Sequence, residues 1–256
     1  MDRPRFFTRQ ALAEGAEVEL EAEPARHIAR TLRMQPGDRL VLFDGSGAEY
    51  PGELIAADKR SVTVRLGAPR AIDRESPLAI ELGIAISRGD RVDWVVQKAT
   101  ELGIARIAPL LTARGLNLPA DRREKKRGHW QRIAESACEQ CGRNRVPVID
   151  DPRPLAPWLD SVDAPLRLVL DPRAEPRDLP AYAGAVALLC GPEGGLEEEE
   201  VTRAQAAGFG TLALGPRVLR TETAPLAALA ALQARASFTY ENNKKRFNMR
   251  RRIRFC

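Results

Sequence analysis

Residues 185–224 read AVALLC-GPEGG-LEEEEVTRAQAAG-FGTLAL-GPRVLRTETA, and this stretch decides the fold class. Two apolar runs, 185–190 and 209–214, are each followed by a glycine-containing loop and then by a stretch with helical character. Strands that feed helices in this way are typical of open α/β sheets, which bind ligands beyond the carboxyl ends of their strands. We therefore expect loops 191–195 and 214–224 to outline a single ligand pocket.

The first loop lacks the features of a polyphosphate site. Its glycines allow a sharp turn and a close approach to a ligand, but no Lys-Ser/Thr pair follows and the spacing is not G-x-G-x-x-G. Four consecutive glutamates, Glu197–Glu200, fall in the expected first turn of the next helix, where they suit the helix dipole and would repel phosphate. The pattern favours a neutral or cationic adenosine-type ligand. A strand-to-helix turn that binds no ligand is the alternative.

The second loop places charged side chains between two apolar elements. Gly208 has the position of a helix C-cap, and Pro225 lies in the first turn of a helix expected over 226–236, which is almost entirely alanine and leucine. Charged groups between buried elements need a partner or a task. Arg220 and Glu222 therefore either pair with each other or act on a ligand.

A set of further motifs occurs in order along the chain. They are Arg5-Phe6-Phe7, His27-Ile28 with Leu32-Arg33, Gln97–Gly103, Cys138-Glu139-Gln140 with Gly142-Arg143, GPEGG and LRTETA. Together they resemble the ribosomal RNA small subunit methyltransferase E family, of the SPOUT class, over nearly the whole chain to about residue 240. The resemblance implies methylation of N3 of a uridine in bacterial 16S rRNA. It also implies S-adenosylmethionine held bent within a trefoil knot, and a homodimer whose site lies at the subunit contact.

The alternation of strand and helix patterns divides the chain into two parts. Residues 1–70 carry short strand patterns, the prolines and mixed charges of 71–77 indicate a linker, and strand and helix patterns alternate from residue 78. We expect an α/β fold, with a SPOUT-type trefoil-knot methyltransferase domain and a mostly parallel sheet over 78–240. The resemblance implies that the first part is a small PUA-like β-barrel that binds RNA.

The sequence also predicts the local structure of two segments of the second part. The proline-rich stretch 151–165 is expected to be an irregular surface connection. A helix beginning near Trp130 has Cys138 on its apolar side and Glu139 on its polar side, close to Arg143 beyond the expected helix end. Because no second cysteine pair or histidine lies at ligand spacing, we expect a core cysteine and no metal.

The net charge of +5 is unevenly distributed along the chain. Residues 241–256 contain seven basic residues and one acidic residue, a charge of +6, so residues 1–240 sum to −1. RNA affinity must then come from local patches, because phosphate contacts need clustered Lys and Arg. The candidates are Arg5, Arg33 and Arg143, their neighbours Arg3, Arg30 and Arg145, and the run Arg122–Arg127. The basic tail departs from the family pattern, and we expect it to be disordered.

Methylation of N3 would give defined roles to the charged groups of the two loops. The uridine imide keeps its proton at neutral pH, so its attack on a sulfonium methyl needs proton removal or stabilisation of charge on the carbonyl oxygens. Arg220 suits the second task and Glu222 the first, with Glu193 as a second candidate base. The residues expected to hold the cofactor are Leu170, Gly191, Glu193, Gly194, Gly195, Leu214, Gly215, Leu219 and Thr223.

Two other functions fit parts of this pattern. A ribose 2′-O-methyltransferase of the same superfamily would share the glycine loop but resembles proteins with a Ser-Leu-Asn segment where this chain has 219–222. A non-catalytic RNA-binding protein would retain only a vestigial pocket. No stretch approaches the ~20 apolar residues of a membrane span, and the N-terminus lacks a signal-peptide core, so a cytoplasmic protein is expected.

Overall fold

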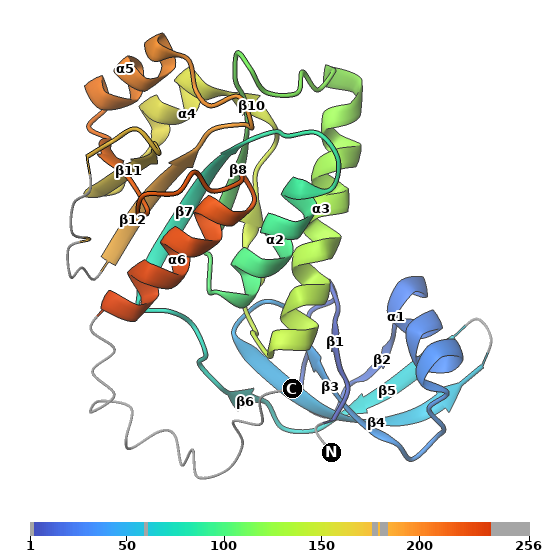
Figure 1. The fold of residues 1–256 in the computed structure, drawn as a ribbon. Helices are drawn as coiled ribbons and strands as arrows, with labels where there is room; N and C mark the ends of the chain where they lie inside the picture. Colours follow the sequence, from blue (N-terminus) through green and yellow to red (C-terminus); the bar gives the residue numbers. More distant parts are fainter. Residues whose placement is uncertain (1–2, 59–60, 176–178, 180–183, 237–256) are drawn as a thin grey trace.

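The chain forms two domains that meet at the end of a long helix, as a computed structural model of the protein shows (Figure 1). The structure describes residues 3–58, 61–175, 179 and 184–236. The basic tail, whose disorder was predicted, lies outside the described residues. Within the described part of the chain, no helix is both long enough and apolar enough to cross a membrane.

The first domain is a mixed β-sheet with a short helical segment at its edge. Its strands are β1 (Arg5–Phe7), β2 (Glu17–Glu19), β3 (Arg39–Phe43), β4 (Ala48–Ala57), β5 (Val62–Leu66) and β6 (Arg70–Ala71). The order is β1-β3-β4-β5-β2, with β6 beside β4; the β1–β3 pair is parallel and the others are antiparallel. Helix α1 (Ala22–Arg26) continues into a π-helix, η1 (His27–Leu32), and Ile28 packs from it into the domain's core.

The second domain is built on an all-parallel sheet, as the alternating pattern predicted. Its strands are β7 (Leu78–Ala85), β8 (Arg106–Leu111), β9 (Val148–Ile149), β10 (Arg153–Pro154), β11 (Leu166–Leu170), β12 (Gly184–Cys190) and β13 (Gly210–Leu212). The order is β10-β8-β7-β12-β11-β13, with β9 beside β8. Because all strands point the same way, the loops after β11, β12 and β13 emerge at one edge of the sheet. The predicted trefoil knot stays a prediction.

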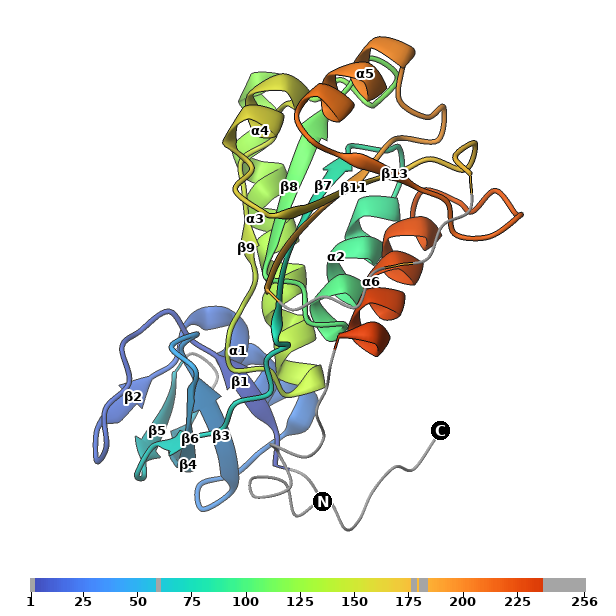
Figure 2. The ribbon, with the colours of Figure 1, turned by 90° about the vertical axis from the view of Figure 1, so that its left-hand side faces the viewer.

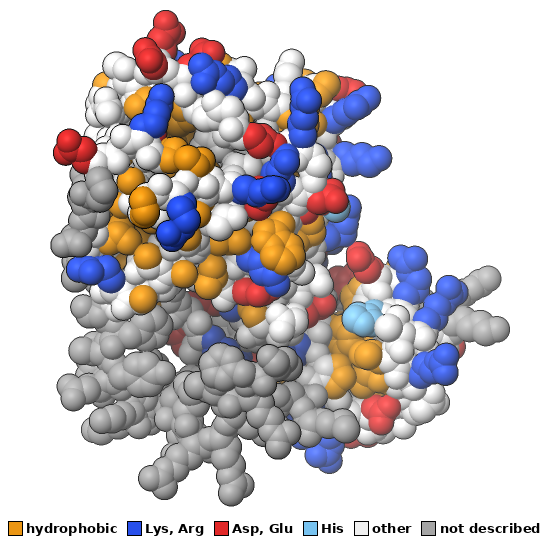
Figure 3. All heavy atoms as spheres, viewed as in Figure 1, with side chains coloured by type: hydrophobic (Ala, Val, Ile, Leu, Met, Phe, Trp, Pro, Cys, Tyr) orange, Lys and Arg blue, Asp and Glu red, His pale blue; other side chains and the backbone are white. Residues whose placement is uncertain are grey.

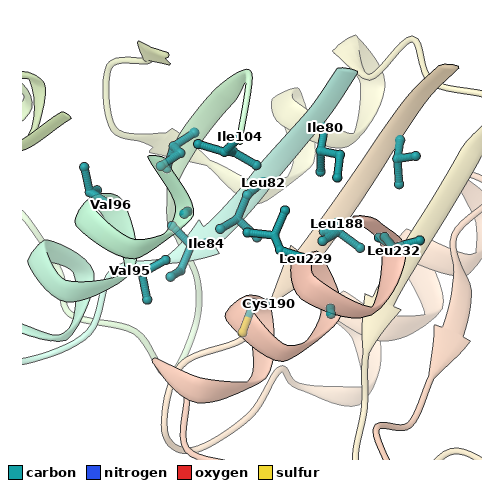
Figure 4. Packing of buried hydrophobic residues seen from close by; sticks show 14 of the residues in the cluster. Ile80, Leu82, Ile84, Val95, Val96, Ile104, Leu188, Cys190, Leu229 and Leu232 are labelled. Atoms are coloured by element: carbon teal, nitrogen blue, oxygen red, sulfur yellow. The ribbon is translucent and has the colours of Figure 1, made fainter. Parts of the chain in front are cut away.

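Helices cover both faces of this sheet (Figure 2). They are α2 (Arg91–Glu101), α3 (Ala120–Cys141), α4 (Leu155–Ser161), α5 (Glu198–Ala206) and α6 (Thr223–Arg235). Alternate residues of β12 point to opposite faces, so Leu188 packs with α2 and α6, whereas Leu189 packs with α4 and α5. Figure 4 shows the first of these cores, in which Leu229 and Leu232 of α6 lie close to Leu188.

Two local predictions were wrong. Helix α3 begins at Ala120 rather than near Trp130, because the charged run 122–127, which hides the apolar period, belongs to its first turns. The stretch 151–165 is not irregular, since it contains β10 and α4. Two of its four prolines, Pro154 and Pro157, lie at the N-cap and in the first turn of α4, where the missing N–H groups cost little.

Helix α4 is anchored by Trp158, whose side chain is fully buried. Its indole N–H donates to Glu81 Oε1 at 2.6 Å, and its ring lies directly over Gly83 of β7. A Cβ atom at position 83 would lie 2.6 Å from the ring, so only glycine permits this close contact.

Candidate active site

A pocket of about 640 Å³ lies at the carboxyl edge of β11, β12 and β13. Its apolar lining comes from the strand ends and the residues that follow them: Val169, Leu170, Leu196, Leu212 and Leu214. The GPEGG loop and residues 217–222 supply the rest of the wall. The structure therefore brings the two glycine-containing loops together around one cavity.

The glycine loop is a tight turn that packs against the helix it precedes. The N–H of Gly195 donates to the carbonyl of Pro192 at 2.9 Å, and Gly195 has a φ of 71°, a conformation that favours glycine. A Cβ atom on Gly191 would lie 3.0 Å from atoms of Leu196. The glycines thus allow the backbone both to turn and to approach its neighbours closely.

The two loops are joined by the side chain of Thr221, which is 9% exposed. Its hydroxyl donates to the carbonyl of Gly191 at 2.8 Å. The Cys190 thiol lies 3.7 Å from the Thr221 carbonyl, and burial raises the pKa of this thiol to about 12. Cys190 therefore stays a neutral packing group at the pocket wall rather than a nucleophile.

The glutamates after the GPEGG loop do not line the pocket. Glu197 and Glu200 form a capping box at the start of α5, and Glu200 also accepts the N–H of Ala113 at 2.9 Å. The charged lining includes five arginines among the described residues: Arg91, Arg114, Arg173, Arg217 and Arg220. The four glutamates are therefore not part of the pocket lining, and the carboxylates of Glu197 and Glu200 serve the helix and its neighbours.

Arg91 connects the two loops and was missed in the sequence. It is the first residue of α2, and its guanidinium pairs with Glu193 of the GPEGG loop. Its Nε lies 3.5 Å from Glu222 Oε2, a buried atom that has no hydrogen bond. The available signal was position: Arg91 follows β7, the neighbour of β12, and strand ends of a parallel sheet share an edge.

Arg220 is exposed at the pocket and is not paired with Glu222. Its carbonyl accepts the N–H groups of Thr223 and Ala224 at 2.9 Å each, which fixes its backbone against the start of α6. Among the described residues its guanidinium makes no ion pair or hydrogen bond. The alternative of an Arg220–Glu222 pair is thus wrong, because Glu222 is paired with Arg91 instead.

Most of the residues predicted to hold a cofactor line this pocket. They are Leu170, Gly191, Glu193, Gly194, Gly195, Leu214 and Leu219, together with the predicted catalytic pair Arg220 and Glu222. Two others lie elsewhere: Gly215 forms the turn behind the loop with a φ of 86°, and Thr223 faces a neighbouring groove. The assignment of the lining residues to a cofactor stays a prediction.

Two of the three predicted RNA ligands instead belong to the joint between the domains. Arg143 is 5% exposed, pairs with Glu75 at 2.5 Å, and donates to the carbonyls of Thr100 and Ile104 at 2.9 and 3.0 Å. Each of its three guanidinium nitrogens donates at least one hydrogen bond within the protein, and so little of the side chain is exposed that a phosphate has no direct access to it. The prediction that Arg143 contacts RNA does not hold in this structure.

Arg5 has the same kind of surroundings. It donates to Glu49 at 2.5 Å and crosses the domain joint to Asn144 at 2.6 Å. Next to it, the N–H of Phe7 donates to Glu139 Oε1 at 2.9 Å, and burial raises the pKa of Glu139 to about 7. Arg33 differs, because it lies exposed at the end of η1 with a φ of 53°.

Comparisons with known proteins agree with both halves of this architecture. A family model described as RNA methyltransferase domain matches residues 74–233, and one described as RNA methyltransferase PUA domain matches residues 20–67. The ribosomal RNA small subunit methyltransferase E of Buchnera aphidicola is 32% identical over 239 residues, which cover 90% of this chain and 95% of that protein. The Bacillus subtilis enzyme of the same name is also 32% identical, over 89% of this chain and 95% of its own.

The chain belongs to the ribosomal RNA small subunit methyltransferase E family. It is therefore an rRNA methyltransferase with a SPOUT-type α/β domain and a PUA-like domain. A crystal structure of the family's protein from Neisseria gonorrhoeae, bound to S-adenosylmethionine, is 38% identical with a TM-score of 0.85, covering 92% of this chain and 98% of that one. A Legionella pneumophila methyltransferase in complex with the same cofactor is 39% identical with a TM-score of 0.89, covering 92% and 99%.

The pocket of this family member suits S-adenosylmethionine chemically. Val169, Leu170 and Leu212 offer an apolar surface for an adenine ring, and the GPEGG turn leaves backbone groups close to the cavity. Charged groups for the amino and carboxylate ends of a methionine moiety stand at the rim. They include Asp171, whose pKa stays below its ordinary value because hydrogen bonds from Arg173 outweigh the opposing effect of burial.

Proposed function

We propose that this chain transfers a methyl group from S-adenosylmethionine to N3 of a uridine in 16S rRNA. The observation that carries the proposal is that one pocket wall contains both an exposed Arg220, which has no partner among the described residues, and a half-buried Glu222. A weakly acidic imide nitrogen needs both a cation beside its carbonyl oxygens and an acceptor for its proton.

Bound S-adenosylmethionine supplies a methyl group on a cationic sulfur; as the methyl carbon bonds to N3, the C–S bond breaks and its electron pair stays on sulfur. Glu222 accepts the proton that leaves N3. Arg220 donates hydrogen bonds to the uridine carbonyl oxygen on which negative charge develops, and its planar guanidinium suits that role. Glu193 is the weaker candidate base, because Arg91 donates a hydrogen bond to its carboxylate and its side chain is 39% exposed, whereas Oε2 of Glu222 is buried and accepts no hydrogen bond.

Exposed basic side chains on both domains support RNA as the substrate. Arg26, Arg30 and Arg33 surround α1 and η1, and Arg122 and Lys125 stand on the first turns of α3. Figure 3 shows Lys and Arg side chains gathered over these two regions, on either side of the space between the domains. We place Arg33 among the residues that contact the rRNA backbone.

The outward face of α6 supports a homodimer. Of its thirteen residues only Arg235 is charged, although Leu226 and Ala227 are half-buried and Ala230 is exposed. Small apolar side chains allow a second helix to approach closely, and charged residues are depleted from the centres of protein interfaces. The proposal places the homodimer in the cytoplasm, where 16S rRNA is found, and light scattering of the purified chain tests its mass.

The decisive experiment uses small ribosomal subunits from cells that lack this enzyme. Incubation with the purified chain and S-adenosylmethionine, followed by nucleoside mass spectrometry, is expected to yield 3-methyluridine. The Arg220→Ala variant, which should bind cofactor normally, serves as the matched control and should yield far less product.

Two other outcomes would replace the proposal. A 2′-O-methylated nucleoside in place of 3-methyluridine would identify a ribose methyltransferase, although the Ser-Leu-Asn segment is absent from this sequence. Absence of product together with no heat in a cofactor titration would identify a non-catalytic RNA-binding protein.

A further inference from the structure

A second groove, of about 710 Å³, lies beside the cofactor pocket. It is lined by Arg88, Gly89, Asp90, Arg91, Trp94, Glu222 and Thr223. Of the residues that the structure describes, only Arg91 and Glu222 line both cavities. The ion pair between these two side chains is therefore the wall that separates the pocket from the groove.

Trp94 gives the groove an aromatic surface. The other two tryptophans, Trp130 and Trp158, are fully buried, whereas Trp94 is 53% exposed. The ammonium group of Lys98 lies 5.2 Å from the centre of its indole ring. An exposed aromatic ring with cationic neighbours is the combination that proteins use to stack an unpaired base of single-stranded RNA.

We propose that this groove is the subsite for the target nucleotide. The base stacks on Trp94 with its N3 edge toward Glu222, and Arg88 at the groove's margin faces the phosphate of the same nucleotide or the next. This inference rests on the proposed function and adds the position of the methyl acceptor to it.

The shared wall explains how donor and acceptor meet. Reacting atoms must come within about 3–3.5 Å of each other before transfer, and the cofactor occupies the pocket on one side of the wall. A base in the groove would approach from the other side. Glu222 borders both cavities, so its carboxylate can take the N3 proton at the point where the new C–N bond forms.

The composition of the groove favours a nucleotide over a second protein chain. Four of its seven lining residues are ionisable: Arg88, Asp90, Arg91 and Glu222. Charged residues are depleted at the centres of protein interfaces, whereas a nucleotide presents both a stacking face and a phosphate. The uncharged outward face of α6 lacks these groups.

The test compares Trp94→Ala, Trp94→Phe and the wild type in steady-state methylation of small subunits at saturating cofactor. Loss of base stacking should lower kcat/KM for RNA by about 5- to 150-fold in Trp94→Ala, and Trp94→Phe should recover most of the loss. The cofactor Kd from calorimetry should stay within about twofold, since Trp94 does not line the cofactor pocket. Val148→Ala removes apolar surface from a side chain that is 49% exposed on β9, away from both cavities, and should change nothing.

Two results would overturn the subsite. One is unchanged kcat/KM in Trp94→Ala; the other is conversion of that variant to a smaller oligomer, which would make Trp94 part of a subunit contact. Affinity for a uridine-containing RNA, measured by filter binding without cofactor, separates this inference from the proposed function. If the wild type makes no 3-methyluridine but Trp94→Ala still weakens RNA binding, the groove is supported as a nucleotide subsite and the assigned reaction is contradicted.

Discussion

The arginines of the domain joint and those of the cofactor pocket have the same chemistry but opposite surroundings. At the joint, Arg143 and Arg5 are enclosed and donate to carboxylate, carbonyl and amide oxygens, although the Nε of Arg5 has no hydrogen-bond partner. At the pocket, Arg220 and Arg217 are exposed, and among the described residues neither makes an ion pair. A guanidinium that is enclosed and hydrogen-bonded within the protein serves the fold, whereas an exposed one held in place by its backbone can serve a ligand.

The largest effect that this comparison predicts is the cost of breaking the joint. Arg143→Met leaves Glu75 and two backbone carbonyls without their partner, and removal of one member of a buried pair costs about 3–5 kcal/mol. Because Glu75 is 22% exposed, we expect about 3 kcal/mol in urea unfolding. Adding Glu75→Gln should restore part of the loss, since it removes the unpaired charge.

The control for this prediction is Arg132→Ala, because Arg132 is exposed on α3 and substitutions at such surface positions are worth within about 0.5 kcal/mol. If Arg143→Met were as stable as Arg132→Ala but weakened RNA binding, Arg143 would be an RNA ligand after all, and the comparison would fail.

Substitution of Arg220 in the pocket should lower the rate of methylation and leave the stability of the protein unchanged. Loss of one donor to a developing oxyanion costs about 10²–10³-fold in kcat, or about 2.7–4 kcal/mol of transition-state stabilisation. Arg220→Ala should therefore lose about 100-fold in kcat, with an unchanged unfolding midpoint and cofactor Kd. Arg220→Lys should recover only part of the rate. Full turnover in Arg220→Ala would contradict the electrostatic role.

Local sequence patterns were enough to predict the position of the pocket but not the ion pairs among its charged side chains. The two loops follow apolar runs in one continuous segment, so their common edge followed from the parallel-sheet pattern. Arg91 comes from a strand end about a hundred residues earlier and pairs with Glu193 through tertiary structure alone. No periodicity links these positions, and the sequence therefore suggested an Arg220–Glu222 pair instead.

The sequence also did not show which charged side chains are buried or already paired in the folded protein. Arg143 follows the C-cap glycine of α3, where a charged side chain is normally solvated, but Glu75 of the segment between the domains and the carbonyls of Thr100 and Ile104 enclose its guanidinium. The role of Glu197 and Glu200 was likewise not visible in the sequence, because a capping box and an ion pair between Glu197 and Arg114 use carboxylates that were expected to face the ligand. The cofactor class followed nonetheless, since the family resemblance supplied it independently.

The joint also has a predicted pH dependence, centred on Glu139. Burial raises the pKa of Glu139 to about 7 in the folded protein, above its ordinary value of 4.5, so the folded state holds this proton more tightly. Its contribution to stability is present below pH 4.5 and is lost as the pH rises towards 7. Relative to Glu139→Gln, which still accepts the Phe7 N–H, the wild type should therefore become less stable by about 3 kcal/mol between pH 4.5 and 8, at about 1.4 kcal/mol for each pH unit between the two pKa values. A pH-independent difference in urea unfolding would remove Glu139 as the source.

The smallest predicted effect concerns Thr221, and it tests whether a hydrogen bond between the two pocket loops stabilises the protein, the bound cofactor or both. Thr221 is the buried polar residue that ties the second loop to the first, through its hydroxyl and the Gly191 carbonyl. Thr221→Val keeps the side-chain volume and removes that hydrogen bond, which is worth about 1 kcal/mol. Because the bond connects two walls of the cavity, the cost should appear both as a slight loss of stability and as a several-fold weaker cofactor Kd.

Thr202→Val, at an exposed position of α5, should affect neither quantity. If Thr221→Val lowered stability and left cofactor binding unchanged, Thr221 would belong with Arg143 as a purely structural group. Two adjacent residues of the second loop would then have different roles, with Thr221 stabilising the fold and Arg220 acting on the ligand.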